Sequence, residues 1–219
     1  MTDVIDNAQL AGIVALTLRV TGAALVIATL VGVPAGALLG MVRFPGRQAV
    51  RLVLYTGMGL PPVVVGLFVY VALSRSGPMG SLGWLFTPTA MIVAQTVIAF
   101  PLVAGLTMSA VESVSIGLRQ QAAALGASRR QVGRMMLGEA RIGVTAAIVA
   151  AFGAIISEVG SVMMVGGNIE GQTRVLTTAI VLHTRQGEFA FAAALGAALI
   201  VLTLAANALL LRLQGRGRR

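Results

Sequence analysis

Long apolar stretches alternate with short arginine-bearing segments along the whole 219-residue chain. Five of these stretches exceed the roughly 20 residues that an α-helix needs to cross a bilayer. The pattern therefore predicts an all-α polytopic membrane protein with one transmembrane domain over residues 10–212. The five transmembrane helices are expected at about residues 10–42, 52–74, 89–111, 142–165 and 189–211.

Two of the predicted spans contain residues that modify a plain helix. Gly32, Gly36 and Gly40 recur every four residues in the first span, and such a stripe of small residues lets another helix approach closely. Pro61 and Pro62 lie inside the second span. Because proline removes a backbone donor, we expect this helix to be broken or to begin late.

Composition and charge support the membrane assignment and give it a direction. The chain is 57% hydrophobic and 11% charged, whereas about a quarter of a soluble domain is charged. All 16 basic residues are arginines, which in a membrane protein mark cytoplasmic loops rather than a nucleic-acid partner. Twelve follow the first, third and fifth spans and three follow the second and fourth, which places the N-terminus outside and the C-terminus inside, with a basic cytoplasmic tail at residues 213–219.

The segment Gly117–Arg141 is a basic loop with helical character. Its pattern predicts two short helices that meet at a corner, the first ending at Gly126 and the second beginning with a capping box at Ser128–Gln131. The expected apolar sides carry Leu118, Ala122 and Leu125 in the first helix and Val132, Met135 and Met136 in the second. An ordinary cytoplasmic loop lying on lipid headgroups is the alternative interpretation.

Glu158 is the only charge well inside the fourth predicted span. Ionisable groups at such positions are expensive and usually functional. One hypothesis is that Ser157, Glu158 and Ser161 border a gate across a dimer axis, with Glu158 bracing the gate rather than binding an anion. The alternative is a structural role in which Glu158 pairs with an arginine such as Arg174.

The loop after the fourth span offers groups that could receive an oxyanion through backbone amides, hydroxyls and one guanidinium. They belong to Gly166, Gly167, Asn168, Thr173 and Arg174. An ordinary turn explains the same residues. The apolar residues 175–182 are too few to cross a bilayer and predict a re-entrant or surface helix. His183, the only histidine, is expected at the surface rather than on a metal, and the absence of cysteine excludes thiolate metal sites.

The basic loop resembles the EAA loop of type I ABC importer permeases through Ala122, Leu125, Gly126 and Ala127. It departs from that motif at Gln120, Gln121 and Gly138-Glu139. Several further segments are similar to the tungstate-specific branch of the oxyanion permeases. These are GLPPVVVGL at 59–67, LSRSGPMG at 73–80, GEAR at 138–141 and ISEVGSVMMVGGNIEGQTRVLTTAI at 156–180.

The resemblance implies a multi-pass permease in the plasma (inner) membrane of a prokaryote. It implies a homodimer that pairs with two ATP-binding-cassette subunits and receives tungstate from an external oxyanion-binding protein. Sibling permeases for molybdate or sulfate share parts of the pattern. ATP and Mg would be bound by the partner, so no cofactor and no enzymatic activity are expected of this chain. Docking is assigned to Gln120, Gln121, Ala122, Ala123, Leu125, Gly126 and Ala127, with Arg129 and Arg130 free for carboxylates or lipid phosphates.

Three rival classes can be compared with this one. An intramembrane hydrolase needs a nucleophile and a base inside the bilayer, but the sole histidine lies in a loop and no GxSG occurs. A stand-alone secondary transporter or channel is disfavoured because five spans carry no inverted repeat. A structural partner without transport function stays open. ATPase activity of the chain itself is not expected, since no GxxxxGK[ST] phosphate loop occurs.

Overall fold

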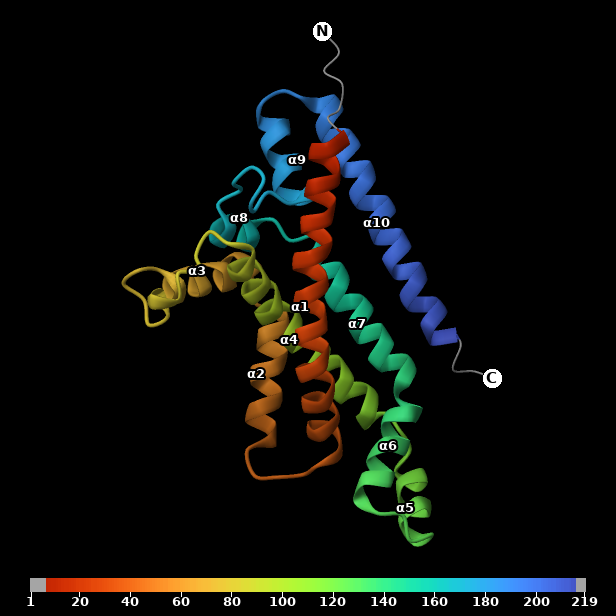
Figure 1. Ribbon diagram of the computed structural model, residues 1–219. Helices are drawn as coiled ribbons and strands as arrows, with labels where there is room; N and C mark the ends of the chain where they lie inside the picture. Colours follow the sequence, from red (N-terminus) through yellow and green to blue (C-terminus); the bar gives the residue numbers. More distant parts are fainter. Residues whose placement is uncertain (1–6, 216–219) are drawn as a thin grey trace.

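The computed structural model describes residues 7–215, and every regular element within them is helical (Figure 1). The predicted all-α class is therefore confirmed. Of the expected tail at 213–219, residues 213–215 continue the last helix and the rest lie outside the described residues. The elements are α1 (Asn7–Met41), α2 (Arg47–Gly59), α3 (Pro62–Leu73), η1 (Gly80–Leu82), α4 (Pro88–Glu112), α5 (Ile116–Ala124), α6 (Arg129–Glu139), α7 (Arg141–Ile156), α8 (Gly160–Gly166), α9 (Leu176–Arg185) and α10 (Phe189–Gly215).

Three helices, α1, α4 and α10, are long and apolar enough to cross a membrane. Two bent pairs, α2 with α3 and α6 with α7, raise the number to five if each pair counts as one span. The α5–α6 segment lies at one end of the molecule, whereas α9 and the start of α1 lie at the other (Figure 1).

The core of the fold is the seam between α1 and α4. At Gly36 a Cβ atom would collide with the carbonyl oxygen of Ala104, and at Gly40 it would come within 2.9 Å of the Cβ of Val111. The glycine stripe therefore does what its spacing predicts: it brings the α1 backbone against α4. The buried seam continues through Val20, Ala24 and Val103.

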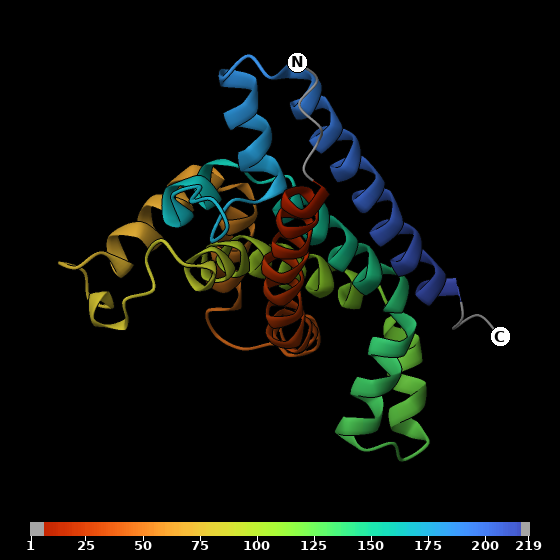
Figure 2. The ribbon, with the colours of Figure 1, turned by 45° about the horizontal axis from the view of Figure 1, so that its top comes forward.

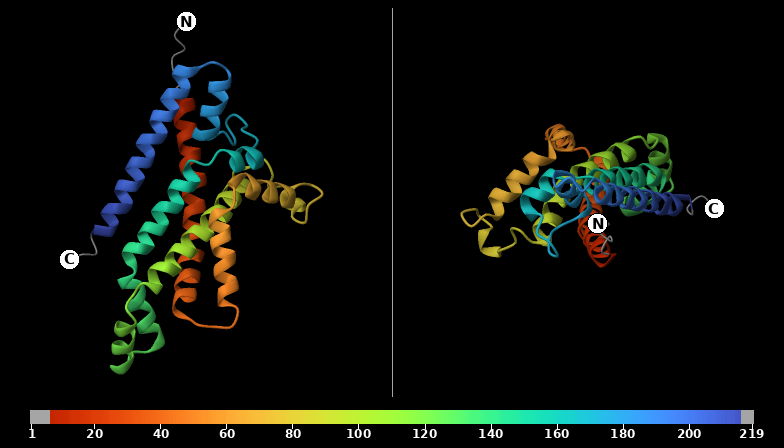
Figure 3. Two further views of the ribbon diagram at one scale, coloured as in Figure 1. Left: turned by 180° about the vertical axis from the view of Figure 1, so that it is seen from behind. Right: turned by 90° about the horizontal axis from the view of Figure 1, so that it is seen from above.

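The second predicted span is broken at the prolines, as expected. α2 ends at Gly59, α3 begins at Pro62, and the two helix axes differ by 102°. Seen from above, α3 runs sideways out of the bundle (Figure 3). Pro61 cannot donate to the preceding turn, so the chain leaves the helix here and restarts in a new direction.

The fourth predicted span is not the continuous helix expected over residues 142–165. α7 stops at Ile156, and a new short helix, α8, begins at Gly160. At about 1.5 Å per residue, the 16 residues of α7 cover roughly 24 Å, which is less than a full hydrocarbon core. At the break, both the carboxylate and the backbone carbonyl of Glu158 form hydrogen bonds to groups outside α7, as described below.

The segment 175–182 forms most of α9, a short helix that packs against α10 and α1 at one end of the molecule (Figure 3). Leu176 and Ala179 are buried against Ile13 and Leu195. The backbone amide of Leu176 also donates to the Thr17 hydroxyl of α1 at 3.0 Å. α9 thus attaches α10 to the rest of the bundle.

Candidate functional site

The segment between α4 and α7 folds as two short helices, here called the α5–α6 hairpin, that project from the bundle (Figure 2). α5 ends in a Schellman motif, in which the amide of Ala127 donates to the carbonyl of Ala122 and that of Gly126 to Ala123, both at 3.0 Å. Gly126 has φ 82°, a value that glycine adopts at little cost. The predicted helix end at Gly126 is confirmed.

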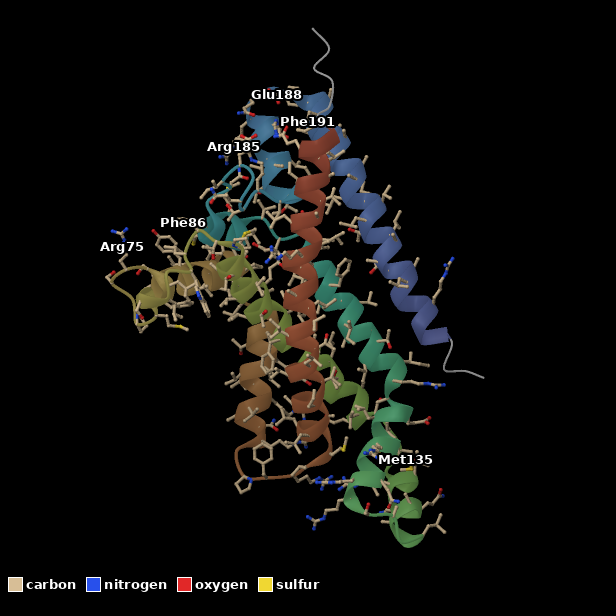
Figure 4. The ribbon with its side chains drawn as sticks, in the orientation of Figure 1. Arg75, Phe86, Met135, Arg185, Glu188 and Phe191 are labelled. Carbon is tan, nitrogen blue, oxygen red and sulfur yellow. The ribbon has the colours of Figure 1, made fainter. Side chains whose placement is uncertain are left out.

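α6 begins with the predicted capping box. The Ser128 hydroxyl accepts the amide of Gln131, whose side chain accepts the amide of Ser128 at 2.8 Å. On the side facing the bundle, Met136 is buried and Val132 packs beside it, while Met135 is half-buried. Figure 4 shows Met135 at the hairpin end of the molecule. The hairpin is therefore attached at its base and free at its corner.

The corner itself is exposed and largely apolar. Leu125 is 89% exposed, more than any other exposed large hydrophobic side chain described. Its predicted packing beside Leu118 is wrong, because Leu125 follows the last helical residue, whereas Leu118 does pack at the hairpin base. Among the residues predicted for docking, Ala122 and Ala127 are half-buried and the rest are exposed, namely Gln120, Gln121, Ala123, Leu125, Gly126, Arg129 and Arg130.

A polar cluster that the sequence reasoning missed lies beside the hairpin base. Glu112, the last residue of α4, pairs with Arg47 and, at 3.5 Å, with Arg51, both from α2. Arg47 also donates from Nε to the carbonyl of Leu39 at 2.9 Å. Arg119 of α5 donates to the carbonyl of Met41 at 3.0 Å. The sequence does offer a signal for this cluster. Glu112 ends the third predicted span, and Arg47 and Arg51 precede the second, so both ends are expected on the same side of the membrane.

The break between α7 and α8 brings together Ser157, Glu158 and Ser161, the predicted gate residues. The Glu158 carboxylate accepts the amide of Ser161 at 2.8 Å, and its carbonyl accepts the Thr177 hydroxyl of α9 at 2.9 Å. Ser157 is exposed and donates to the carbonyl of Gly153 at 2.8 Å. Ser161 is fully buried.

The expected structural alternative, an ion pair between Glu158 and Arg174, is not formed. Arg174 instead pairs with Glu170 at 3.3 Å, four residues earlier in its own loop. Because Glu170 is only four residues from Arg174, the two can pair within the loop, away from Glu158. Glu158 therefore acts locally as a cap for the start of α8.

The two broken helices meet at α3 and α8. A Cβ at Gly66 of α3 would lie 2.6 Å from the Cα of Ser161, and one at Gly160 of α8 would lie 2.6 Å from the Val63 side chain. This contact is closer than larger residues would allow. It places the break before Pro62 next to the break that contains Glu158.

The loop 166–174 uses much of its polar capacity internally. Thr173 is buried, donates to the carbonyl of Gly166 at 2.6 Å and accepts the amide of Ile169 at 2.9 Å. Gly167 and Asn168 adopt positive φ and form the turn after α8. Two buried groups of the loop have no hydrogen-bond partner, Asn168 Oδ1 and Arg174 Nε. Arg174, which also pairs with Glu170, lines a surface cavity of about 290 Å³.

His183 corrects another expectation, because it is buried rather than at the surface. It is 8% exposed, its Nδ1 lies 2.6 Å from a Glu188 carboxylate oxygen, and its ring meets the Phe191 ring edge-on at 4.5 Å. Glu188 and Phe191 lie at the end opposite the hairpin (Figure 4). Since α9 and α10 enclose the imidazole, the lone histidine belongs to their packing.

Sequence comparisons place this architecture among known proteins. Residues 32–219 match the family described as binding-protein-dependent transport system inner membrane component. The chain is 44% identical over 212 residues to a probable anion ABC transporter permease protein of Haloferax volcanii, covering 94% of this chain and 91% of the relative. It is 40% identical over 206 residues to a tungstate uptake system permease protein of Peptoclostridium acidaminophilum, covering 94% and 90%. A molybdenum transport system permease protein of Escherichia coli K12 is 31% identical over 185 residues, covering 80% and 81%.

The fold agrees with these relatives. An inward-facing structure of the MetNI methionine ABC transporter superposes with a TM-score of 0.82 at 22% identity, with full coverage of both chains. The predicted type I ABC importer permease fold is thereby confirmed. The chain belongs to the binding-protein-dependent transport system inner membrane component family, as an ABC importer permease of the oxyanion type.

Proposed function

We propose that this chain is the permease subunit of an ATP-driven tungstate importer. In this proposal two copies form the pathway, two ATP-binding-cassette subunits hydrolyse Mg-ATP, and an external binding protein delivers the anion. The N-terminus lies outside and the α5–α6 hairpin lies in the cytoplasm of a prokaryotic cell. Support for tungstate comes from the relative of that name, whose 40% identity exceeds the 31% of the molybdenum permease.

The observation that carries the proposal is the exposed corner of the hairpin. Alanine, glycine and leucine surface at Ala123–Gly126 projects away from the bundle, where water or another protein must cover it. Small residues leave a helix surface that fits into a partner's cleft. Arg129 and Arg130 flank this surface and can pair with carboxylates of the partner. Such a surface suits docking of the ATP-binding subunit better than contact with lipid headgroups.

The second part of the proposal is the pathway. Irregular backbone at membrane depth is tolerated where it lines a cavity or is buried in protein. Leu60, Pro61 and Ser157 are exposed at the two adjacent breaks in the single chain, so in the proposed dimer these breaks would line the pathway, and we assign Ser157, Glu158 and Ser161 to the gate. Arg174 is the group in loop 166–174 best placed to contact a passing oxyanion, with Gly166, Gly167, Asn168 and Thr173 shaping the loop around it.

Reconstitution tests the function directly. The permease, its ATP-binding subunit and the binding protein are placed in liposomes, and uptake of tungstate is measured with and without ATP. ATP-dependent tungstate uptake is expected, with molybdate and sulfate as weaker competitors. Uptake without the ATP-binding subunit would instead identify a stand-alone transporter, and stronger competition by molybdate or sulfate would reassign the anion.

The docking assignment is tested by Gly126→Leu. Leucine is strained at φ 82° and adds bulk at the corner, so we expect membrane insertion to persist and co-purification of the ATP-binding subunit to be lost. Gly138→Leu is the matched control, because Gly138 is exposed in α6 with open space around its Cβ position. Leu125→Gln removes apolar surface without backbone strain and should weaken the same association. An intact complex with both corner variants would refute the docking assignment.

A further inference from the structure

Glu112 joins two helices, α4 and α2, whose relative positions matter for the proposed transport cycle. It ends α4, and its carboxylate contacts two arginines of the first turns of α2, Arg47 directly and Arg51 at 3.5 Å. A second bond between the same helices joins the hydroxyls of Tyr55 and Ser109 at 3.2 Å. α2 is therefore attached to the end of α4 through both charge and hydrogen bonding.

The arginines extend this connection to α1 and α5. Arg47 donates to the carbonyls of Leu39 and Gly40 at 2.9 and 3.5 Å, and Arg119 donates to Met41 at 3.0 Å. The last carbonyls of a helix have no partners inside it, so these donors complete the end of α1. We call Arg47, Arg51, Glu112 and Arg119 the Glu112 cluster.

The cluster lies between the two parts of the proposed machinery. Only residues 113–115 separate Glu112 from the start of α5, so a displacement of the hairpin reaches Glu112 with little slack. On the other side, α2 continues without interruption from Arg47 to Gly59. Its far end is the break next to Pro61, which lies beside the break that contains Glu158.

Partial burial strengthens the pair. The side chains of Arg47 and Glu112 are 20% and 25% exposed. Fully exposed ion pairs contribute little to stability, whereas removing one partner of a buried pair leaves an uncompensated charge. Neutralising Glu112 would remove the charge partner of both arginines of α2, and so weaken the attachment of α2 to α4.

We propose that Glu112 is a positioning residue that makes α2 move with the α5–α6 hairpin. Motion of the ATP-binding subunit, which docks on the hairpin, then reaches the broken helices of the pathway. This inference rests on the proposed function. In it, the Glu112 cluster stays closed through the transport cycle. The hairpin, the end of α4 and α2 then move as one unit.

The first test compares Glu112→Gln with Glu139→Gln in the complete reconstituted complex. Glu139 is an exposed acid at the end of α6, so it controls for loss of one negative charge near the hairpin. We expect Glu112→Gln to keep ATP hydrolysis but to transport at least about fivefold less tungstate per ATP, the lower end of typical coupling effects. Equal transport per ATP in the two variants would overturn the proposal.

The second test needs no damaging substitution. Because the chain contains no cysteine, spin labels at Gln48→Cys of α2 and Ser113→Cys after α4 report one distance. In the otherwise wild-type complex, we expect this distance to stay constant between nucleotide-free and ATP-bound states, and to broaden in Glu112→Gln. A distance that changes with nucleotide in the wild-type complex would show that the cluster opens, and the proposal would fail. Failure of the proposed function is distinct, since it would show as no ATP-driven uptake by the wild-type complex.

Discussion

Glu158 has an observed structural role, and the proposed gate assigns it a functional one as well. Its carboxylate caps the start of α8 through the amide of Ser161, and a negative group is stabilised near a helix N-terminus. The sequence identified Glu158 as unusual because it was the single charge in an apolar stretch. The sequence could not show which residue the Glu158 carboxylate contacts, because the choice between Ser161 and Arg174 depends on where the helix breaks.

Two substitutions separate the roles of Glu158. Glu158→Gln keeps an acceptor for the Ser161 amide but removes the charge, so we expect thermal stability near wild type and reduced ATP-driven tungstate uptake. Glu158→Ala also removes the cap and should cost about 1 kcal/mol of stability. Uptake in proteoliposomes and thermal unfolding in detergent measure the two effects. Wild-type uptake by Glu158→Gln would leave Glu158 with only its capping role.

Among the elements, those governed by neighbouring residues were predictable and those governed by distant contacts were not. The corner of the hairpin follows from Gly126 and the Ser128–Gln131 capping box, which act within a few residues. The break in the fourth span is accompanied by a bond from the Thr177 hydroxyl to the backbone carbonyl of Glu158, 19 positions apart. The pairing of Arg47 with Glu112 joins residues 65 apart, so no local pattern could predict it.

The α1–α4 seam gives a test at the level of helix packing. Gly36→Leu would force a side chain into the carbonyl of Ala104, and overpacking of this kind costs roughly 1–3 kcal/mol or more. Gly22→Leu is the matched control in the same helix, because open space surrounds the Cβ position of Gly22. We expect the first variant to lower the midpoint of thermal unfolding and the yield of folded protein, and the second to leave both nearly unchanged. Equal stability of the two variants would mean that the seam tolerates separation.

In the whole molecule, the hairpin and the α9–α10 connection lie at opposite ends, with the apolar helices between them (Figure 1). This arrangement agrees with a membrane-spanning chain whose arginine-rich hairpin lies on one side of the membrane. The distribution of arginines predicts that this side is the cytoplasm.

Impermeant maleimide labelling tests the orientation in intact cells. Gln186→Cys lies exposed after α9 and should react from outside, whereas Gln120→Cys lies exposed in α5 and should react only after the inner membrane is opened. The cysteine-free parent chain supplies the blank. Reaction of Gln120→Cys in intact cells would reverse the proposed orientation and remove the docking assignment.

α10 has a practical consequence for handling the protein. Only 11% of the most apolar 18-residue stretch of α10 is buried by the rest of the chain. Its main packing partners are α9 and α7. Its 27 residues extend over about 40 Å at 1.5 Å per residue. The detergent chosen for purification therefore has to cover the apolar surface of this helix. A micelle whose hydrophobic belt is thinner than the helix is long would leave the helix ends exposed to water. Preparations in long-chain detergents or nanodiscs should accordingly keep the C-terminal helix in place longest.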